Sequence, residues 1–81
     1  MLTIYGSMLC PDCCKCREDL DRANVEYTYL DFGESVRHLK EFLKLREESS
    51  AFDQARMNGS IGIPCIVQED GTVTLTWEEF L

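Results

Sequence analysis

Residues 10–16 read CPDCCKC and stand between a short β-prone segment, residues 2–5 (LTIY), and a helical pattern that continues to residue 23. Pro11 suits the first turn of that helix, because proline lacks the N–H that would be unpaired there and its φ is already helical. After the helix, residues 25–30 (VEYTYL) are rich in β-branched and aromatic side chains and predict a second strand. The order strand, helix, strand predicts a βαβ unit with parallel strands and a right-handed crossover.

The middle of the chain predicts two helices. Ser35 is a suitable N-cap for the first, whose apolar residues recur at helical spacing until a Ser-Ser pair at residues 49–50 interrupts it. Ser50, followed by Asp53, resembles a capping arrangement for a second, short helix that continues through Met57. These helices separate the βαβ unit from the last part of the chain.

The last part of the chain predicts a β-hairpin. Residues 63–67 (IPCIV) read as a buried strand that begins at a proline, Asp70-Gly71 is a strong turn signal, and residues 73–76 form the returning strand. Thr76 and Glu79 have the spacing of a capping box for one last turn of helix. Together with the βαβ unit, the hairpin predicts an α/β fold with a mixed four-stranded sheet flanked by helices. This is the architecture of the thioredoxin fold.

The composition limits the classes of protein that the chain can represent. Its 81 residues make one domain, residues 1–81, and a content of 44% hydrophobic and 28% charged residues is ordinary for a globular domain. The formal net charge of −7 repels phosphate, so we expect no nucleic-acid partner. The start MLTIY lacks a basic segment followed by an apolar run, and no apolar stretch approaches membrane-span length. We therefore expect a cytoplasmic monomer without membrane contact.

Five cysteines in a reducing compartment indicate catalysis or metal binding more than a disulfide scaffold, because an odd number cannot all pair. Cys10 and Cys13 form a C-x-x-C at a strand-to-helix junction, which reads as a dithiol–disulfide couple. The free N–H groups and positive dipole at the helix start favour a thiolate, so Cys10 is the predicted nucleophile. Cys13, about one helical turn later, is the predicted resolving cysteine. Asp12 acts against the thiolate, because a nearby carboxylate raises the pKa of a thiol.

Three separated features of the chain resemble the glutaredoxins and their short redoxin relatives: Tyr5, the Cys10-Pro11-x-Cys13 motif and Ile63-Pro64. The resemblance covers nearly the whole chain, from the first strand through the active-site helix to the proline-led hairpin and final helix. It implies a thiol–disulfide oxidoreductase that reduces protein or low-molecular-weight disulfides.

The resemblance also implies roles for residues outside the cysteine pair. The Ile63–Pro64 peptide bond would be cis, Pro64 would shape the floor of the site, and the backbone of Ile63 would hold an extended thiol substrate. Pro11 and Asp12, inside the motif, complete the predicted substrate-binding residues.

Two departures from the glutaredoxin pattern bear on the substrate. Glutaredoxins usually carry a lysine three residues before the first cysteine, where this chain has Ser7. The glycine pair that helps bind glutathione in the family is replaced within residues 75–79 (LTWEE), whose glutamates would repel an anionic tripeptide. We therefore expect weak use of glutathione, even as a reductant, and no bound cofactor. The expected partners are a protein disulfide or another small thiol, and either a low-molecular-weight thiol or a flavoprotein reductase would restore the dithiol.

The remaining cysteines carry separate expectations. At about 100° per residue, Cys14 lies roughly 40° to one side of Cys10 on the helix and Cys13 roughly 60° to the other, whereas Cys16 is displaced by roughly 120°. Cys16 is therefore expected in the core, and Cys14 is either a packed residue or a reserve thiol that exchanges with Cys10. Strand alternation directs the Cys65 side chain to the face opposite that of Pro64, so Cys65 is expected to pack in the sheet.

Other functions stay open. Glutaredoxin-like domains can hold an iron–sulfur cluster between two chains, and clustered thiolates suit soft metals such as zinc or copper(I). The four clustered cysteines make a poor cage while the helix is intact, and His38 has no neighbouring ligand pair, so we predict no metal site. A third possibility is a redox-sensing module that binds a partner only when Cys10 and Cys13 are oxidised. Met8 and Leu9, beside the nucleophile, are either an apolar lip for a partner or a loop packed on the core.

Overall fold

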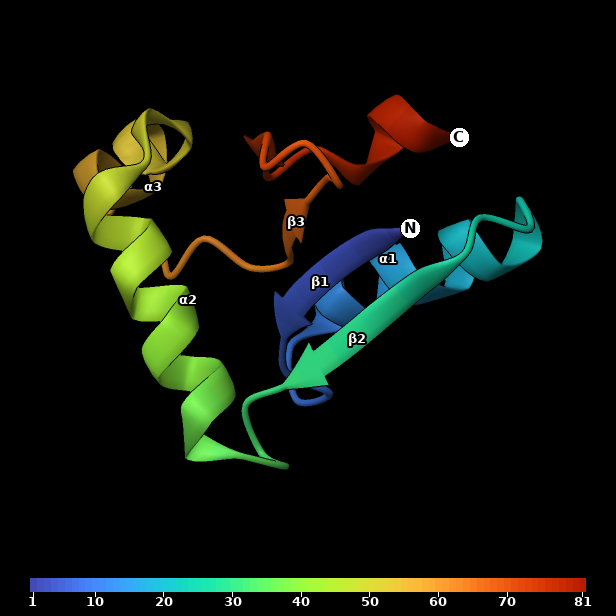
Figure 1. Ribbon diagram of the computed structural model, residues 1–81, viewed down its shortest axis with the longest axis horizontal. Coiled ribbons are helices and arrows are strands. Elements are labelled where there is room, and N and C mark those ends of the chain that lie inside the picture. The colour runs from blue at the N-terminus through green and yellow to red at the C-terminus, as the bar shows by residue number, and fades with distance from the viewer.

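The chain folds as a mixed α/β structure around one four-stranded sheet in the computed structural model, which describes residues 1–81 (Figure 1). In chain order the elements are β1 (Leu2–Gly6), α1 (Pro11–Arg22), β2 (Tyr27–Asp31), α2 (Val36–Glu48), the 3₁₀-helix η1 (Ser50–Phe52), α3 (Asp53–Asn58), β3 (Cys65–Val67), β4 (Val73–Thr74) and the 3₁₀-helix η2 (Trp77–Phe80). The strand order is β2–β1–β3–β4, in which β1 runs parallel to β2 and antiparallel to β3, and β3 runs antiparallel to β4. The predicted α/β class and mixed four-stranded sheet are confirmed.

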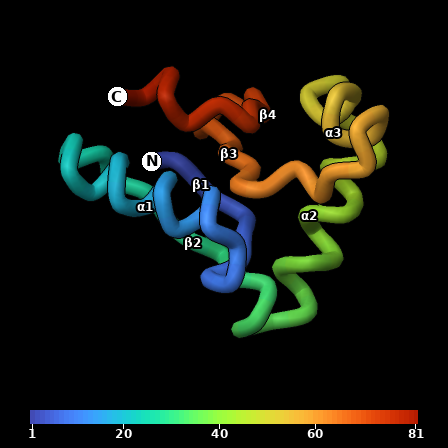
Figure 2. The backbone as a smooth tube through the Cα atoms, turned by 180° about the vertical axis from the view of Figure 1, so that it is seen from behind, coloured from blue at the N-terminus to red at the C-terminus, as the bar shows by residue number.

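The first part of the chain forms the predicted βαβ unit. α1 lies behind β1 and β2 in Figure 1 and in front of them in Figure 2, so it covers one face of the sheet. β2 begins at Tyr27, later than the predicted start at residue 25. Asn24 has a φ of 59°, and the N–H of Val25 donates to the carbonyl of Leu20 at 2.9 Å. These two residues therefore still belong to the turn that closes the C-terminal end of α1.

Side-chain alternation along β1 and β3 builds a cluster of buried residues on each face of the sheet. On the α1 face the buried residues are Ile4, Cys16, Leu20 and Ile66, and Trp77 and Phe80 of η2 pack against them. On the α2 face they are Phe42, Phe52 and Cys65. The rings of Phe42 and Phe52 meet edge to face with their centroids 5.6 Å apart. The two faces are therefore covered by different helices.

The serine caps of the middle helices are partly as predicted. Ser35 caps α2 by accepting a hydrogen bond from the N–H of Arg37 at 3.2 Å, which confirms that expectation. The expectation that Ser50 caps the next helical segment is wrong, because Ser49 does so by accepting from the N–H of Ala51 at 3.2 Å. Residue 49 lies just outside the helical turn and has the extended backbone of a capping residue, whereas Ser50 is already inside it.

The hairpin strands are shorter than predicted. β3 starts at Cys65, where the ladder with β1 begins. β4 ends at Thr74, whose hydroxyl accepts from the N–H of Thr76 at 3.1 Å and donates to Glu79 at 2.6 Å. The predicted capping box of Thr76 with Glu79 is therefore wrong, since Thr74 takes the glutamate instead and η2 has no side-chain cap.

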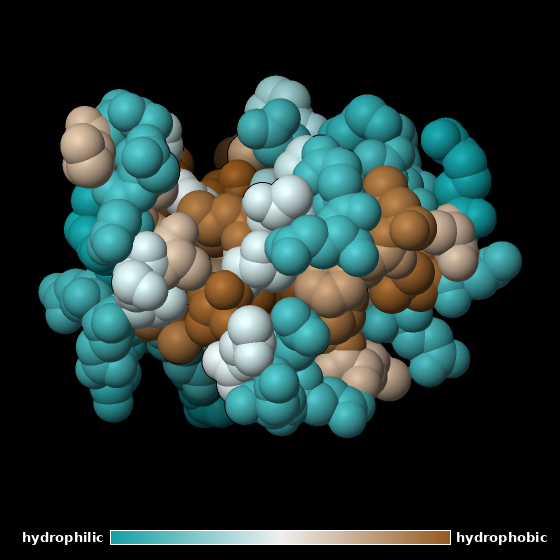
Figure 3. Space-filling view, turned by 90° about the horizontal axis from the view of Figure 1, so that it is seen from above, coloured by the Kyte–Doolittle hydropathy of each residue, from teal (hydrophilic) through white to brown (hydrophobic).

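Viewed from above Figure 1, apolar side chains gather along the middle of the molecule and hydrophilic side chains surround them (Figure 3). No helix combines the length and the apolar character that a membrane-spanning helix requires.

Candidate active site

Cys10 is the N-cap residue of α1, at the end of the loop that follows β1. Its N–H donates to the carbonyl of Ser7 at 3.0 Å, and its carbonyl accepts from the N–H of Cys14 at 3.1 Å, which begins the helix. No side chain caps this end of α1. A thiolate at Cys10 would therefore meet unpaired N–H donors and the positive end of the helix dipole.

Cys13 lies one turn into α1 and is fully buried, whereas Cys10 is only half-buried. Both cysteines are free thiols. Burial raises the pKa of Cys13 from an ordinary 9.0 to about 12, and the neighbouring Cys10 acts in the same direction. The two thiols are thus unequal, because Cys10 can be approached from solvent, whereas Cys13 is shielded from solvent and its pKa is raised.

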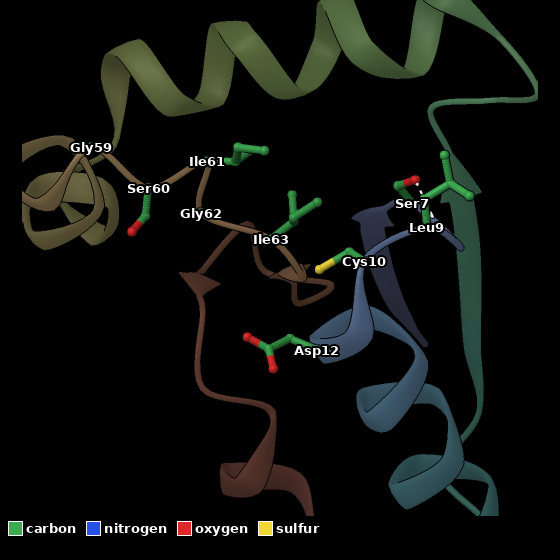
Figure 4. Close-up of a pocket in the computed structure, with 9 residues that line it drawn as sticks. All are labelled: Ser7, Leu9, Cys10, Asp12, Gly59, Ser60, Ile61, Gly62 and Ile63. Carbon is green, nitrogen blue, oxygen red and sulfur yellow. Dashed lines mark hydrogen bonds between the residues drawn. The ribbon is translucent and has the colours of Figure 1, made fainter.

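A cavity of about 530 Å³ opens beside Cys10 between two segments of the chain (Figure 4). One wall is the loop before α1 with the first residues of that helix, and the other is the segment that leads from α3 to β3. The residues that line it are Ser7, Leu9, Cys10, Asp12, Gly59, Ser60, Ile61, Gly62 and Ile63. In Figure 4 the Cys10 thiol points across the gap toward Ile63. A substrate in this cavity would lie directly against the predicted nucleophile.

The wall opposite Cys10 presents free backbone groups. The Ile63–Pro64 peptide bond is cis, as the family resemblance implies. Neither the N–H nor the carbonyl of Ile63 makes a hydrogen bond within the chain. Arg46 of α2 holds the same segment, donating to the carbonyl of Ile61 at 2.8 Å and to that of Ser60 at 2.7 Å. The backbone of Ile63 is therefore held in place beside Cys10 with its donor and acceptor unused.

The structure brings three of the six predicted site residues to this cavity: Cys10, Asp12 and Ile63. Cys13 and Pro64 are fully buried and do not line it. Pro11 is exposed at the start of α1 and also lies outside the lining.

The other three cysteines have different surroundings. Cys16 and Cys65 are fully buried, which confirms the expectation that they pack in the core, and burial raises the pKa of each to about 12. Cys14 is half-buried, and its thiol donates to the carbonyl of Met8 at 3.3 Å. No group of three or more His, Cys, Asp or Glu side chains is arranged to hold a metal ion.

The two apolar residues before Cys10 extend outward. Leu9 is 94% exposed and lines the cavity, and Met8 is 49% exposed. Of the two alternatives for this loop, the arrangement fits an apolar lip better than a loop packed on the core.

Two residues near the site were not anticipated. Asp31, at the end of β2, is 7% exposed, and its carboxylate accepts from the N–H groups of Met8 at 3.1 Å and Gly33 at 2.6 Å. It therefore ties the loop before α1 to β2. Tyr29, on the same strand, directs its hydroxyl into the space beneath Cys13. For Asp31 the only available signal was position, since the carboxyl ends of parallel strands meet at one edge of a sheet.

Comparison with known proteins gives one relative. An uncharacterized protein of Haemophilus influenzae (strain Rd) is 38% identical to this chain over 72 residues, which is 89% of this chain and 84% of the relative. No protein-family model matches the sequence. No solved structure matches it either.

Proposed function

The chain belongs to the same family as this Haemophilus influenzae protein, and we propose that the chain is a glutaredoxin-like thiol–disulfide oxidoreductase with a thioredoxin fold. The observation that carries the proposal is the placement of Cys10. It is half-buried at the open N-terminus of α1, faces the unused backbone of Ile63 across a cavity, and has the buried thiol of Cys13 one helical turn away. A nucleophile and a substrate-binding backbone thus share one cavity, and a resolving thiol lies buried one helical turn behind the nucleophile.

The reaction proceeds by two exchanges of sulfur. The Cys10 thiolate attacks one sulfur of a substrate disulfide, so that a mixed disulfide forms and the first substrate thiolate leaves and takes up a proton. Cys13 then loses its proton and attacks the Cys10 sulfur. The mixed disulfide breaks, the second substrate sulfur leaves as a thiolate and is protonated, and a Cys10–Cys13 disulfide remains. The substrate has gained two electrons and two protons, and the protein has lost them.

The lining of the cavity favours an extended polypeptide as substrate. The free N–H and carbonyl of Ile63 can pair with a substrate backbone as one strand pairs with another. Leu9, on one wall, and Ile61, 60% exposed on the other, offer apolar contacts to its side chains. Asp12 and Ser7 provide no positive charge for the carboxylates of glutathione. The disulfide substrate is therefore a protein segment in preference to that anionic tripeptide.

The Cys10–Cys13 disulfide must be reduced again after each turnover. A low-molecular-weight thiol or a flavoprotein reductase can supply the two electrons. If the substrate preference above is right, a coupled assay with thioredoxin reductase will give faster turnover than one with glutathione and glutathione reductase. Clearly faster turnover with glutathione would contradict the assignment of the substrate class while leaving the exchange chemistry intact.

The central test compares three serine variants in reduction of a small disulfide. Cys10→Ser should abolish activity, because no other thiol both occupies the N-cap of α1 and lines the cavity. Cys13→Ser should form the mixed disulfide and accumulate it as a covalent adduct that mass spectrometry detects. Cys14→Ser, the matched control on the same helix, should retain activity. Full activity in both of the first two variants would show the proposal to be wrong.

A further inference from the structure

Tyr29 carries the one buried side-chain nitrogen or oxygen atom that has no hydrogen-bond partner in this dithiol form of the protein. Buried polar groups are nearly always hydrogen-bonded, because an unpaired one is left without water and without a replacement. The phenol lies on β2, and the Arg17 guanidinium covers its ring 4.5 Å from the centroid. The ring is therefore held in position with its hydroxyl unused.

The hydroxyl faces the sulfur of Cys13. A Cβ added at Gly6 of β1 would lie 2.7 Å from the Cys13 Sγ and 2.8 Å from the Tyr29 hydroxyl oxygen. Both atoms therefore approach the same point above the β1 backbone, beneath the active-site loop. Only the absence of a side chain at Gly6 leaves room for them to meet.

We propose, resting on the exchange reaction above, that the Tyr29 hydroxyl is a catalytic residue that donates a hydrogen bond to the Cys13 thiolate. That thiolate exists at two moments. In the resolving step Cys13 gives up its proton and its sulfur attacks Cys10, so the Cys10–Cys13 bond forms as the bond to the substrate sulfur breaks. In re-reduction an incoming thiolate attacks Cys10, the Cys10–Cys13 bond breaks, and Cys13 leaves with the electron pair before it takes up a proton. The same donor serves both directions.

The surroundings of Cys13 explain why its thiolate needs a donor. Burial disfavours the charged form. Cys10 carries no charge at either moment, because its sulfur is then bonded to the substrate or the reductant, so burial is the main cost that the Cys13 thiolate has to overcome. Cys16, one turn further along α1, is a second thiol whose charge would oppose that of Cys13. Only the backbone of Ser7 and the Tyr29 hydroxyl act to lower the pKa of Cys13. Tyr29 is thus the one side chain that favours the reactive form.

The surroundings of Tyr29 keep it protonated. Burial raises its pKa well above the usual value, and the charges of Cys13 and Asp31 raise it further, with Arg17 acting in the opposite direction. The phenol therefore donates a hydrogen bond without transferring its proton. The Cys13 proton leaves by another route, to solvent or to the departing substrate thiolate.

The experiment separates the two exchanges with 5,5′-dithiobis(2-nitrobenzoate), in a Cys14→Ser background that removes the other half-exposed thiol. Each exchange releases one coloured thiolate, so stopped-flow absorbance records attack by Cys10 first and resolution by Cys13 second. Tyr29→Phe should leave the first phase unchanged and slow the second about tenfold or more, since hydrogen bonds to charged groups are worth at least that factor. The pH at which the second phase reaches half its maximal rate should rise by about one unit.

Tyr27→Phe is the matched control, because it removes a hydroxyl from the same strand. That hydroxyl contacts Asp21 at 2.8 Å and Arg17 at 3.4 Å and does not reach the cysteines. It should leave both phases and their pH profiles unchanged. Slowing of the second phase in Tyr27→Phe as large as in Tyr29→Phe would overturn the inference.

A second measurement keeps the ring and the hydroxyl in place. Incorporation of 3-fluorotyrosine makes every phenol a stronger donor, so the second phase should accelerate in the Cys14→Ser protein and stay unchanged when Tyr29→Phe is also present. An unaltered second phase in Tyr29→Phe at every pH would refute the role of Tyr29 alone. Absence of the first phase from the parent protein, or of any Cys13-dependent second phase, would instead refute the proposed function.

Discussion

Gly6→Ala adds one methyl group at a crowded point of the candidate site. The new Cβ would meet the Cys13 Sγ at 2.7 Å and the Tyr29 hydroxyl at 2.8 Å, whereas ordinary contacts begin at 3.4 Å. The two neighbours would have to move by about 0.6–0.7 Å. Overpacking of this kind lowers the free energy of unfolding by about 1–3 kcal/mol. Alanine also reduces the conformational entropy of the unfolded chain, which raises the free energy of unfolding by about 0.4–1 kcal/mol. We expect a net loss of about 1–2 kcal/mol, or a fall in Tm of roughly 5–15 °C.

The same shift should slow the resolving step. Displacement of a reacting atom by about 1 Å can lower a rate about a hundredfold, so we expect the attack of Cys13 to slow by about ten- to a hundredfold. Thermal unfolding followed by circular dichroism measures the stability. The two phases of nitrobenzoate release measure the exchange, and the first phase should change little, because Cys10 lies outside the crowded point.

Gly71→Ala is the matched control for this change. Gly71 has a φ of +90° and no atom within 4 Å of its added Cβ, so alanine there introduces backbone strain without a clash. It should cost about 1–2 kcal/mol and leave both phases unaltered. The reasoning is refuted if Gly6→Ala matches the unaltered protein in Tm and second-phase rate, or if Gly71→Ala slows the second phase equally.

Two further predictions concern stability. Burial raises the pKa of Cys13, Cys16 and Cys65 from 9.0 to about 12, so the native state holds these protons more tightly than the unfolded chain. The free energy of unfolding should therefore keep its full value below about pH 9 and decrease as the pH rises toward 12. The decrease should be shallower in Cys65→Ala. A Tm that stays constant between pH 8 and 10.5 in reductant would contradict this expectation. Ser35→Ala removes the cap of α2 and should cost about 1 kcal/mol in urea unfolding, and Ser35→Asp should restore it; equal midpoints for all three proteins would exclude the cap as a stabilising contact.

The element order was predictable because each element carries a local signal. Alternation in residues 2–5 marks the first strand, and Pro11 marks the start of α1. The strand ends were less predictable, because hydrogen bonds within the adjoining turns set them. β2 starts late since Val25 still pairs with Leu20, and the Thr74 hydroxyl ends β4. No local pattern distinguishes these residues from ordinary strand residues.

The candidate site was predictable only in part. The C-x-x-C motif and its helix start identify Cys10 and Cys13, and Ile63 followed from the family resemblance. The Tyr29 hydroxyl gave no signal, because an aromatic residue in an alternating strand reads as packing whether or not its polar atom faces a thiol. The Tyr29 hydroxyl can approach the Cys13 sulfur only because Gly6 of β1 has no side chain at the point where the two atoms meet. That proximity is a property of the folded sheet.

The different environments of the four clustered cysteines follow from their positions on α1. Cys13 and Cys16 lie three residues apart on the buried face of α1, and burial holds the pKa of both thiols near 12. Cys10 and Cys14 lie four residues apart on the half-buried side, and the Cys14 thiol is directed at the carbonyl of Met8. To join all four sulfurs at one metal ion, α1 would have to unwind and Cys16 would have to leave a fully buried cluster. Disulfide exchange between Cys10 and Cys13 requires neither change, and so it is the chemistry that the intact helix favours.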